Sequence, residues 1–431
     1  MEIFTTRPDS TLNLDVLTAT ANGLRELLQN GKVSLRLNAM INTAPKKILL
    51  DIAKSLDDEC ALLGMSGPLH GTPATMKHNA PIVDHHSNAG MAIIGKANLS
   101  VGALLFYIRV ATEHCNHAVG GQTQSPYIVG GLAKGEKLLG QTALVGSSSG
   151  SASSVVAGFA PLAIATEIDG SITQPASRAA LFGIKVTVGR ASTEGTASWS
   201  ALTDSIGGMA KSARDLAYLV DVVLDTISLQ LYTQIRKVKL LAFQQREAYI
   251  YTKKNLVEHG ATLHESVPLN SVDELQFDGD DALDQLWNHD YAKAWEKFLE
   301  NFPSSSMNSI AEIVKFNKLN AKVALPAEHP GQQLLESALE DKMPQEKYVE
   351  GVSLIREAAK TNGIEKTIHQ FGLDVIVGPI DGRKPTIAAA AGHPVGTVPL
   401  GYTKTMDVHL DSLQQTRKQI LRETTPESGD R

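Results

Sequence analysis

Apolar residues recur at two spacings along this chain, and each spacing predicts a different kind of element. Stripes with helical spacing predict helices over 18–31, from Pro45 to Gly64, and over 211–225, 244–259, 281–302 and 345–371. Short apolar runs predict buried strands at 91–95, 238–243, 261–267, 375–379 and 395–400. The strand–helix–strand order over 238–267 favours parallel pairing in a sheet that is covered by helices.

Polar and glycine-rich segments separate these elements. Residues 67–73 (GPLHGTP) predict a turn, and residues 76–88 predict a polar loop. Residues 115–140 predict a long irregular loop, a kind of segment that is often functional. Neither an internal repeat nor a linker is visible, so we expect one domain over 1–403 and a polar, partly disordered tail over 404–431.

Composition describes an ordinary globular protein of 431 residues, with 42% hydrophobic and 20% charged residues. The net charge of −6 argues against nucleic acid as a partner. Cys60 and Cys115 are too few for a disulfide framework, which favours a reducing compartment. Without a visible signal peptide or a long apolar run, we expect a cytoplasmic protein with no membrane partner.

The segment from Val145 to Lys185 is crowded with serine, glycine and alanine. Two clusters, Gly146–Gly150 and Asp169–Ser171, flank a helix-then-strand pattern. Small residues let one backbone approach another or a substrate closely. The pattern therefore predicts that two serine hydroxyls meet in one site, which is typical of a hydrolase.

Ser171 follows Asp169-Gly170 at the end of an apolar run, where a tight turn would expose its hydroxyl. Successive amides in such a turn, from Ile168 through Asp169 and Gly170 to Ser171, could form an oxyanion hole. Taken alone, a Gly-Ser dipeptide is more often a simple turn.

Several motifs occur together in one order, and together they favour a catalytic serine at Ser171 over a simple turn. They are Gly71-Thr72-Pro73-Ala74-Thr75-Met76-Lys77-His78-Asn79, Gly95-Lys96-Ala97-Asn98-Leu99-Ser100, VGSSSGSAS at 145–153, Thr166-Glu167-Ile168-Asp169-Gly170-Ser171-Ile172 and Phe182-Gly183-Ile184-Lys185-Val186-Thr187. In type, order and spacing the set resembles the amidase signature family, most closely its fungal branch. Ser147 and Ser171 are 24 positions apart, as the two catalytic serines of that family are.

The resemblance implies a fold, an activity and a substrate class. It implies an α/β sandwich in a single domain, with one large mixed β-sheet covered by helices and a signature core at about 67–225. It also implies hydrolysis of the C–N bond of a linear, small-molecule amide without metal or organic cofactor. Fungal relatives act on varied amides, some in secondary metabolism, and a homodimer is retained as one option for the oligomeric state.

The resemblance further implies a role for each site residue. Ser171 would attack the amide carbonyl, and Ser147, held by a cis peptide after Gly146, would relay a proton to Lys77. The usual lysine pKa is near 10.4, so Lys77 would need burial to act as a base. Gly146, Ser148 and Thr166 would support the site.

Other interpretations remain open at this level. Gly146-Ser147-Ser148-Ser149-Gly150 also matches the nucleophile elbow of α/β-hydrolases, which would make Ser148 the nucleophile with a histidine such as His393. His78 and Thr173-Gln174 stand where the family usually has aspartate and arginine, and the segment from Lys77 to Gly95 is short. A non-catalytic homologue therefore remains an alternative, as does a glutaminase subunit of an amidotransferase.

Histidines and one cysteine gather before the serine segment, namely His78, His85, His86, His114, Cys115 and His117. They lack the spacing of known zinc motifs, and the acidic stretch 277–284 lacks the spacing of a calcium-binding loop. We therefore expect these residues to be solvated or packed in loops, and we expect no metal site.

Overall fold

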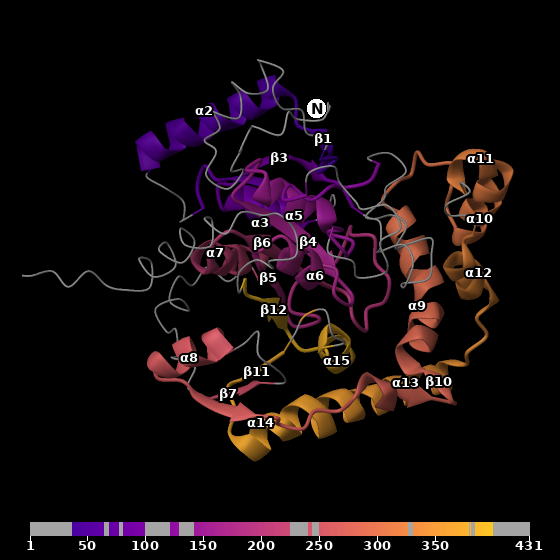
Figure 1. The fold of residues 1–431 in the computed structure, drawn as a ribbon. Coiled ribbons are helices and arrows are strands. Elements are labelled where there is room, and N and C mark those ends of the chain that lie inside the picture. Colours follow the sequence, from indigo (N-terminus) through magenta and orange to yellow (C-terminus); the bar gives the residue numbers. More distant parts are fainter. Residues whose placement is uncertain are drawn as a thin grey trace, which may run out of the picture.

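A computed structural model describes residues 37–63, 69–76, 81–99, 121–128, 142–224, 240–243, 250–325, 331–378, 380 and 384–399 (Figure 1). The helix predicted over 18–31 and the tail 404–431 lie outside these described residues.

The centre of the molecule is a mixed seven-stranded sheet with the order β1-β3-β2-β4-β6-β5-β12. Its strands are β1 (Met40–Thr43), β2 (Pro73–Met76), β3 (Ala92–Ala97), β4 (Leu162–Glu167), β5 (Phe182–Lys185), β6 (Ser205–Ala210) and β12 (Val395–Thr397). β2 is parallel to β3 and β4, and the other neighbours are antiparallel. The expected α/β fold with a large mixed sheet is therefore confirmed.

Helices cover both faces of this sheet, and the alternation of side chains along β4 shows how. Leu162 and Ile164 pack with the cluster under α3 (Ile82–Asn88) and α7 (Ala213–Val223). Ala163 and Ala165 point the other way, into the cluster under α5 (Ser149–Val156) and α6 (Thr173–Arg178). Successive side chains of a strand face opposite sides of a sheet, so the apolar run of β4 is buried on both.

The helix predicted at 211–225 is confirmed as α7. The Ser212 side chain caps it by accepting a hydrogen bond from the Asp215 amide at 3.0 Å. Leu219 of α7 is fully buried. It fits against Gly208 of β6, where a Cβ would lie 2.5 Å from the Leu219 side chain.

The loop predicted over 76–88 is wrong for its second half, because residues 82–88 form α3. Ile82 and His86 lie one helical turn apart and are both buried. His86 Nδ1 donates to the Ile82 carbonyl oxygen, so a polar side chain is accommodated on the buried face. A search for apolar periodicity alone misses this helix, because one position of its buried face is a histidine.

A second, smaller sheet follows in the chain. β7 (Leu240–Phe243), α8 (Ile250–Glu258) and β8 (Thr262–Glu265) form the predicted strand–helix–strand unit, and the two strands are parallel. β11 (Val375–Val377) pairs with β7, also in parallel, to give the order β11-β7-β8. Among the described residues, this sheet is separate from the seven-stranded one.

Helices from α9 to α14 curve around one side of the central sheet and pass beneath it in the view of Figure 1. They are α9 (Ala282–Leu299), α10 (Ile310–Leu319), α11 (Ala321–Ala324), α12 (Gln333–Glu340), α13 (Gln345–Arg356), a π-helical stretch η4 (Glu357–Glu365) and α14 (Lys366–Phe371). The helices predicted over 281–302 and 345–371 are thus confirmed. We call α9–α14 the helical arm.

An aromatic core joins the helical arm to the loop before β6. Trp199 of that loop lies with its ring centroid 4.9 Å from that of Tyr291 in α9. Trp287 Nε1 donates to Thr203 Oγ1 at 2.9 Å, which satisfies the buried indole. The remaining elements α2 (Lys46–Leu63), η3 (Val272–Glu274), β9 (Gln276–Phe277), β10 (Asp280–Asp281) and α15 (Lys384–Ala391) complete the described structure.

Candidate active site

The two serine clusters are in direct contact. The Ser148 amide donates to the Ser171 carbonyl oxygen at 3.1 Å, although the residues are far apart in the chain. Gly146 adopts a φ of +104°, and a Cβ there would lie 2.6 Å from Pro175 Cδ and 3.2 Å from the Gly170 oxygen. Only a residue without a side chain allows this close approach, which explains why a glycine precedes Ser147.

Ser147 and Ser171 each lie in a turn beside a helix. Ser147 is in the turn that leads into α5, and Ser171 lies between the end of β4 and the start of α6. Both are half-buried, so each is partly open to solvent. Gly170, with φ of +79°, makes the tight turn that was predicted before Ser171.

Ser148 and Thr166 hold the two clusters together. The Ser148 hydroxyl donates to the Thr166 carbonyl oxygen at 3.2 Å, and the side chain is fully buried. Ser148 is therefore held through its backbone amide, which binds Ser171, and through its hydroxyl, which binds Thr166. The geometry is that of a support for the turn.

Glu167 is a site residue that sequence reasoning did not single out. Its buried carboxylate accepts from the Ile172 amide at 2.6 Å, the Thr173 amide at 2.8 Å and the Thr173 hydroxyl at 3.2 Å. It thereby satisfies amides at the start of α6, directly after Ser171. The sequence signal was an acid that ends an apolar strand just before a glycine turn.

Asp169 connects the turn to a distant helix. Its Oδ2 accepts a hydrogen bond from Thr386 Oγ1 of α15 at 2.7 Å. The four amides from Ile168 to Ser171, predicted as oxyanion donors, lie in this turn. Glu167 binds the two amides that follow them, so its carboxylate does not occupy the predicted donors.

Asn98, from the motif at 95–100, ties a third segment to the serine helix. Its Nδ2 donates to the carbonyl oxygens of Asn38 and Gly121 at 2.8 and 2.9 Å. The backbone carbonyl oxygen of Asn98 accepts a hydrogen bond from the Gly150 amide at 3.1 Å. A Cβ at Gly150 would lie 2.2 Å from that oxygen, so the glycine is required for α5 to start here.

Lys77 lies outside the described residues, so the structure does not report its distance from either serine. The strand β2 ends one residue before it and runs parallel to β4, with Thr75 opposite Ala163. Parallel strands have their carboxyl ends at the same edge of a sheet. The chain that follows β2 therefore starts at the same edge of the sheet as the chain that follows β4 and leads to Ser171.

One backbone expectation needs correction. No cis peptide bond occurs within the described ranges, which include 142–224, so the bond between Gly146 and Ser147 is trans. The left-handed φ of Gly146, together with the close approach of Pro175, shapes this turn in the structure.

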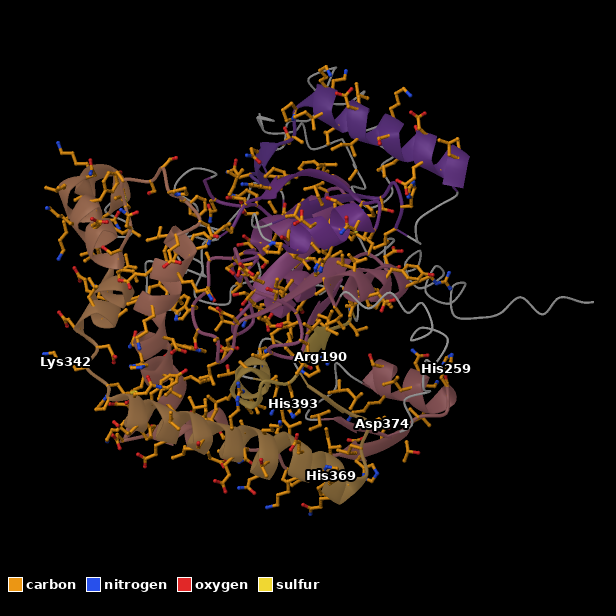
Figure 2. All side chains as sticks on the ribbon, turned by 180° about the vertical axis from the view of Figure 1, so that it is seen from behind. Arg190, His259, Lys342, His369, Asp374 and His393 are labelled. Atoms are coloured by element: carbon orange, nitrogen blue, oxygen red, sulfur yellow. The ribbon has the colours of Figure 1, made fainter. Side chains whose placement is uncertain are left out.

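The nucleophile-elbow alternative does not fit the geometry. The elbow needs a strand directly before its serine, and residues 142–148 form none. Ser148 is fully buried and donates to a carbonyl oxygen. His393, labelled in Figure 2, follows α15 and has its Nε2 3.5 Å from Glu365 Oε1. Burial lowers the pKa of this histidine, while Glu365 raises it.

The histidines and acidic residues weighed as metal ligands lie partly in the described structure. Among the described residues, no group of three or more His, Cys, Asp or Glu side chains could hold a metal ion. His85 and His86 lie in α3, and Asp281 caps α9 by accepting from the Leu283 amide. His78, His114, Cys115 and His117 lie outside the described residues.

The family model for amidases matches residues 25–253, which is more than half of the chain. The chain belongs to the amidase family. The match includes both serine clusters, Lys77 and Asn98, the residues on which the resemblance rested. As a member of this family, the protein has the sequence and fold of an amidohydrolase.

Two curated relatives match this chain over most of its length. A probable amidase of Arabidopsis thaliana is 25% identical over 90% of this chain and 77% of its own length. A putative amidase of Schizosaccharomyces pombe is 26% identical over 90% of this chain and 80% of its own. One glutamyl-tRNA(Gln) amidotransferase subunit, from Acinetobacter baumannii, is 35% identical, but over only 34% of this chain and 26% of its own length.

Solved structures agree with the fold of this chain. The peptide amidase from Stenotrophomonas maltophilia superposes with a TM-score of 0.73 and 26% identity, covering 91% of this chain and 88% of its own. An amidase family protein from Bacillus anthracis gives a TM-score of 0.72 at 23% identity, covering 90% and 86%. In the part of the chain that the structure describes, no helix is long and apolar enough to cross a bilayer.

Proposed function

We propose that this protein hydrolyses a carboxylic amide through an acyl-enzyme on Ser171, with Ser147 as proton relay and Lys77 as base. The observation that carries the proposal is the contact between the two serine clusters, a hydrogen bond of 3.1 Å from the Ser148 amide to the Ser171 carbonyl oxygen. Membership of the amidase family supplies the reaction class.

The proposed reaction has two halves. Ser171 Oγ attacks the carbonyl carbon and passes its proton to Ser147, which passes its own proton to the neutral amine of Lys77. The resulting tetrahedral oxyanion accepts hydrogen bonds from the turn amides 168–171. Collapse breaks the C–N bond, and the proton returns from Lys77 through Ser147 to the leaving amine.

Water completes the second half. It attacks the acyl-enzyme ester while the same lysine and serine take its proton, and the carboxylic acid leaves as Ser171 regains its hydrogen. Ser148, Thr166 and Gly146 would hold the turn during both halves. The chemistry needs no cofactor.

For the substrate, we propose a small linear amide. The similar structure of a peptide amidase makes peptide amides the first compounds to test. Membership of the fungal branch, a role in secondary metabolism and a cytoplasmic location stay predictions from the sequence.

The test is covalent labelling of the purified protein with a fluorophosphonate, followed by peptide mapping. We expect the label on Ser171 of the wild type and none after Ser171→Ala. Ser148→Ala should slow amide hydrolysis without abolishing it, because this hydroxyl only supports the turn. The exposed Ser192→Ala is the control and should label as the wild type does.

Three alternatives give different results. Labelling that survives Ser171→Ala and disappears in Ser148→Ala would sink the assignment. A well-folded wild type that takes no label would indicate a non-catalytic homologue. The third alternative, a glutaminase-type amidotransferase subunit, draws on the local similarity to such a subunit, and co-purification of an ammonia-accepting partner would identify that function.

A further inference from the structure

Thr386 of α15 donates a hydrogen bond to the turn that carries Ser171. Its Oγ1 lies 2.7 Å from Oδ2 of Asp169, a distance typical of a hydroxyl group that binds a carboxylate. Thr386 is buried, and the two residues are 217 positions apart in the chain. Because α15 begins only two residues before Thr386, the helix offers this hydroxyl no carbonyl group four residues earlier. The hydroxyl is therefore available to a partner outside its own helix.

α15 is itself fixed in place, so Thr386 is presented at a defined position. At the other end of the helix, Arg356 Nη1 donates to two carbonyl oxygens of the last turn, at 3.1 and 2.6 Å. A cation at this end also complements the helix dipole. Ile387 lies in the same apolar core against which Ile168, in the Ser171 turn, packs. The helix and the turn thus share one packed core as well as the hydrogen bond.

The aspartate at position 169 is a potential competitor of the substrate. An aspartate side chain commonly accepts a hydrogen bond from the amide two residues further on, which here is the amide of Ser171. That amide is one of the proposed oxyanion donors. In the structure Asp169 Oδ2 binds Thr386, and among the described residues none accepts a hydrogen bond from the Ser171 amide. A carboxylate that turned toward this amide would block it and would also repel the oxyanion.

We propose that Thr386 is a positioning residue, which holds the Asp169 carboxylate toward α15 and so keeps the Ser171 amide available to the substrate oxyanion. The inference rests on the proposed function, because it takes Ser171 as the nucleophile and its turn as the oxyanion hole. Thr386 acts through Asp169 rather than on the reacting atoms. Its hydroxyl is therefore needed only while residue 169 carries a carboxylate.

Loss of this hydroxyl should slow the chemical step more than it weakens binding. Thr386→Val keeps a branched side chain and removes the donor, which releases the Asp169 carboxylate. Loss of one oxyanion donor costs about 100- to 1000-fold in rate, and a donor that is blocked for part of the time costs less. We expect the maximal labelling rate of Ser171 to fall about tenfold. The fluorophosphonate concentration at half-maximal rate should change little, because the oxyanion forms only in the transition state.

The experiment measures the labelling rate against fluorophosphonate concentration in full-length protein. Thr386→Ser keeps the hydroxyl and should restore most of the wild-type rate. The control is Thr367→Val in α14, which removes a buried hydroxyl that donates to the Pro268 carbonyl oxygen at 3.0 Å, and it should label as the wild type does. Equal rate losses in Thr386→Val and Thr386→Ser would overturn the proposal, as would an unchanged maximal rate in Thr386→Val.

A second variant covers the case in which Thr386→Val does not fold. Asp169 is not among the described residues with a positive φ, so alanine fits its backbone. Asp169→Ala removes the competing carboxylate and should label faster than Thr386→Val. Adding Thr386→Val to Asp169→Ala should cause no further loss, because the hydroxyl then has no carboxylate to hold. A further loss in the double variant, or a folded Asp169→Ala that takes no label, would contradict the proposal. Absence of label on wild-type Ser171 would instead refute the proposed function itself.

Discussion

At the scale of single residues, His86 is a buried histidine on the inner face of α3. Its Nδ1 must carry the proton that it donates to the Ile82 carbonyl, and its Nε2 has no partner among the described residues. Burial lowers the pKa of His86 to about 4, the hydrogen bond to Ile82 raises it, and the neighbouring His85 lowers it further. The native state therefore holds this ring neutral.

This lowered pKa predicts a loss of stability in mild acid. As the pH falls from about 6.5 to about 4, the unfolded chain gains a proton on His86 that the native state does not take. The free energy of unfolding should fall by about 3 kcal/mol over that window through this residue alone. His86→Leu should remove this part of the pH dependence in urea unfolding measured at pH 4 and pH 7.

The control is His259→Leu, at an exposed position beside α8 that Figure 2 labels. It should keep the wild-type pH dependence. If His86→Leu kept it as well, the acid sensitivity would have to come from other groups.

At the scale of elements, the approach of the two serine turns depends on Gly146. Gly146→Ala places a Cβ 2.6 Å from Pro175 Cδ at a φ of +104°. Gly158→Ala, after α5, has a φ of +77° and nothing within 4 Å. Both variants introduce backbone strain of about 1 kcal/mol, but only Gly146→Ala adds overpacking of about 1–3 kcal/mol.

We therefore expect Gly146→Ala to lose about 2–4 kcal/mol of unfolding free energy and most of its Ser171 labelling. Gly158→Ala should lose about 1 kcal/mol and label at the wild-type rate. Urea unfolding and the labelling rate check both statements. Equal labelling by the two variants would show that the turn tolerates the added methyl group.

The sequence predicted the helices and strands whose apolar residues recur at a regular spacing. It also predicted the contact between segments that carry recognisable sequence motifs. It anticipated α7, the parallel β7–β8 pair and the meeting of the Ser147 and Ser171 clusters. It did not reveal the role of Glu167, because that role depends on how the chain bends after β4. It also missed the bond between Thr386 and Asp169, which joins segments more than 200 residues apart.

At the scale of the whole molecule, Arg356 fastens the helical arm to the sheet layers. From the end of α13, its Nη1 donates to the carbonyl oxygens of Ala389 and Ala390, and its Nη2 donates to that of Leu202. A second connection is made by Asp290 of α9, which accepts a hydrogen bond from the Ser200 hydroxyl in the loop before β6. Asp290 also accepts from the Tyr348 hydroxyl of α13 at 2.7 Å, within the arm.

Replacing Arg356 tests the first connection. Lysine keeps the charge but lacks the planar fork that reaches α15 and Leu202 together. We expect Arg356→Lys to lower the free energy of unfolding by about 2 kcal/mol in urea titration. Arg214→Lys, at an exposed position, should change the free energy of unfolding by less than about 0.5 kcal/mol. Equal effects of the two variants would show that Arg356 does not hold the arm through its guanidinium group.

The pairing of β5 with β12 has a consequence for how the protein is made. Gly183 of β5 lies opposite Thr397 of β12, so one edge of β5 emerges from the ribosome more than 200 residues before its partner strand exists. An unpaired strand edge can template pairing with a neighbouring chain. β5 is only four residues long, and short edge strands discourage such pairing. The brevity of β5 therefore protects the nascent sheet against aggregation before β12 is made.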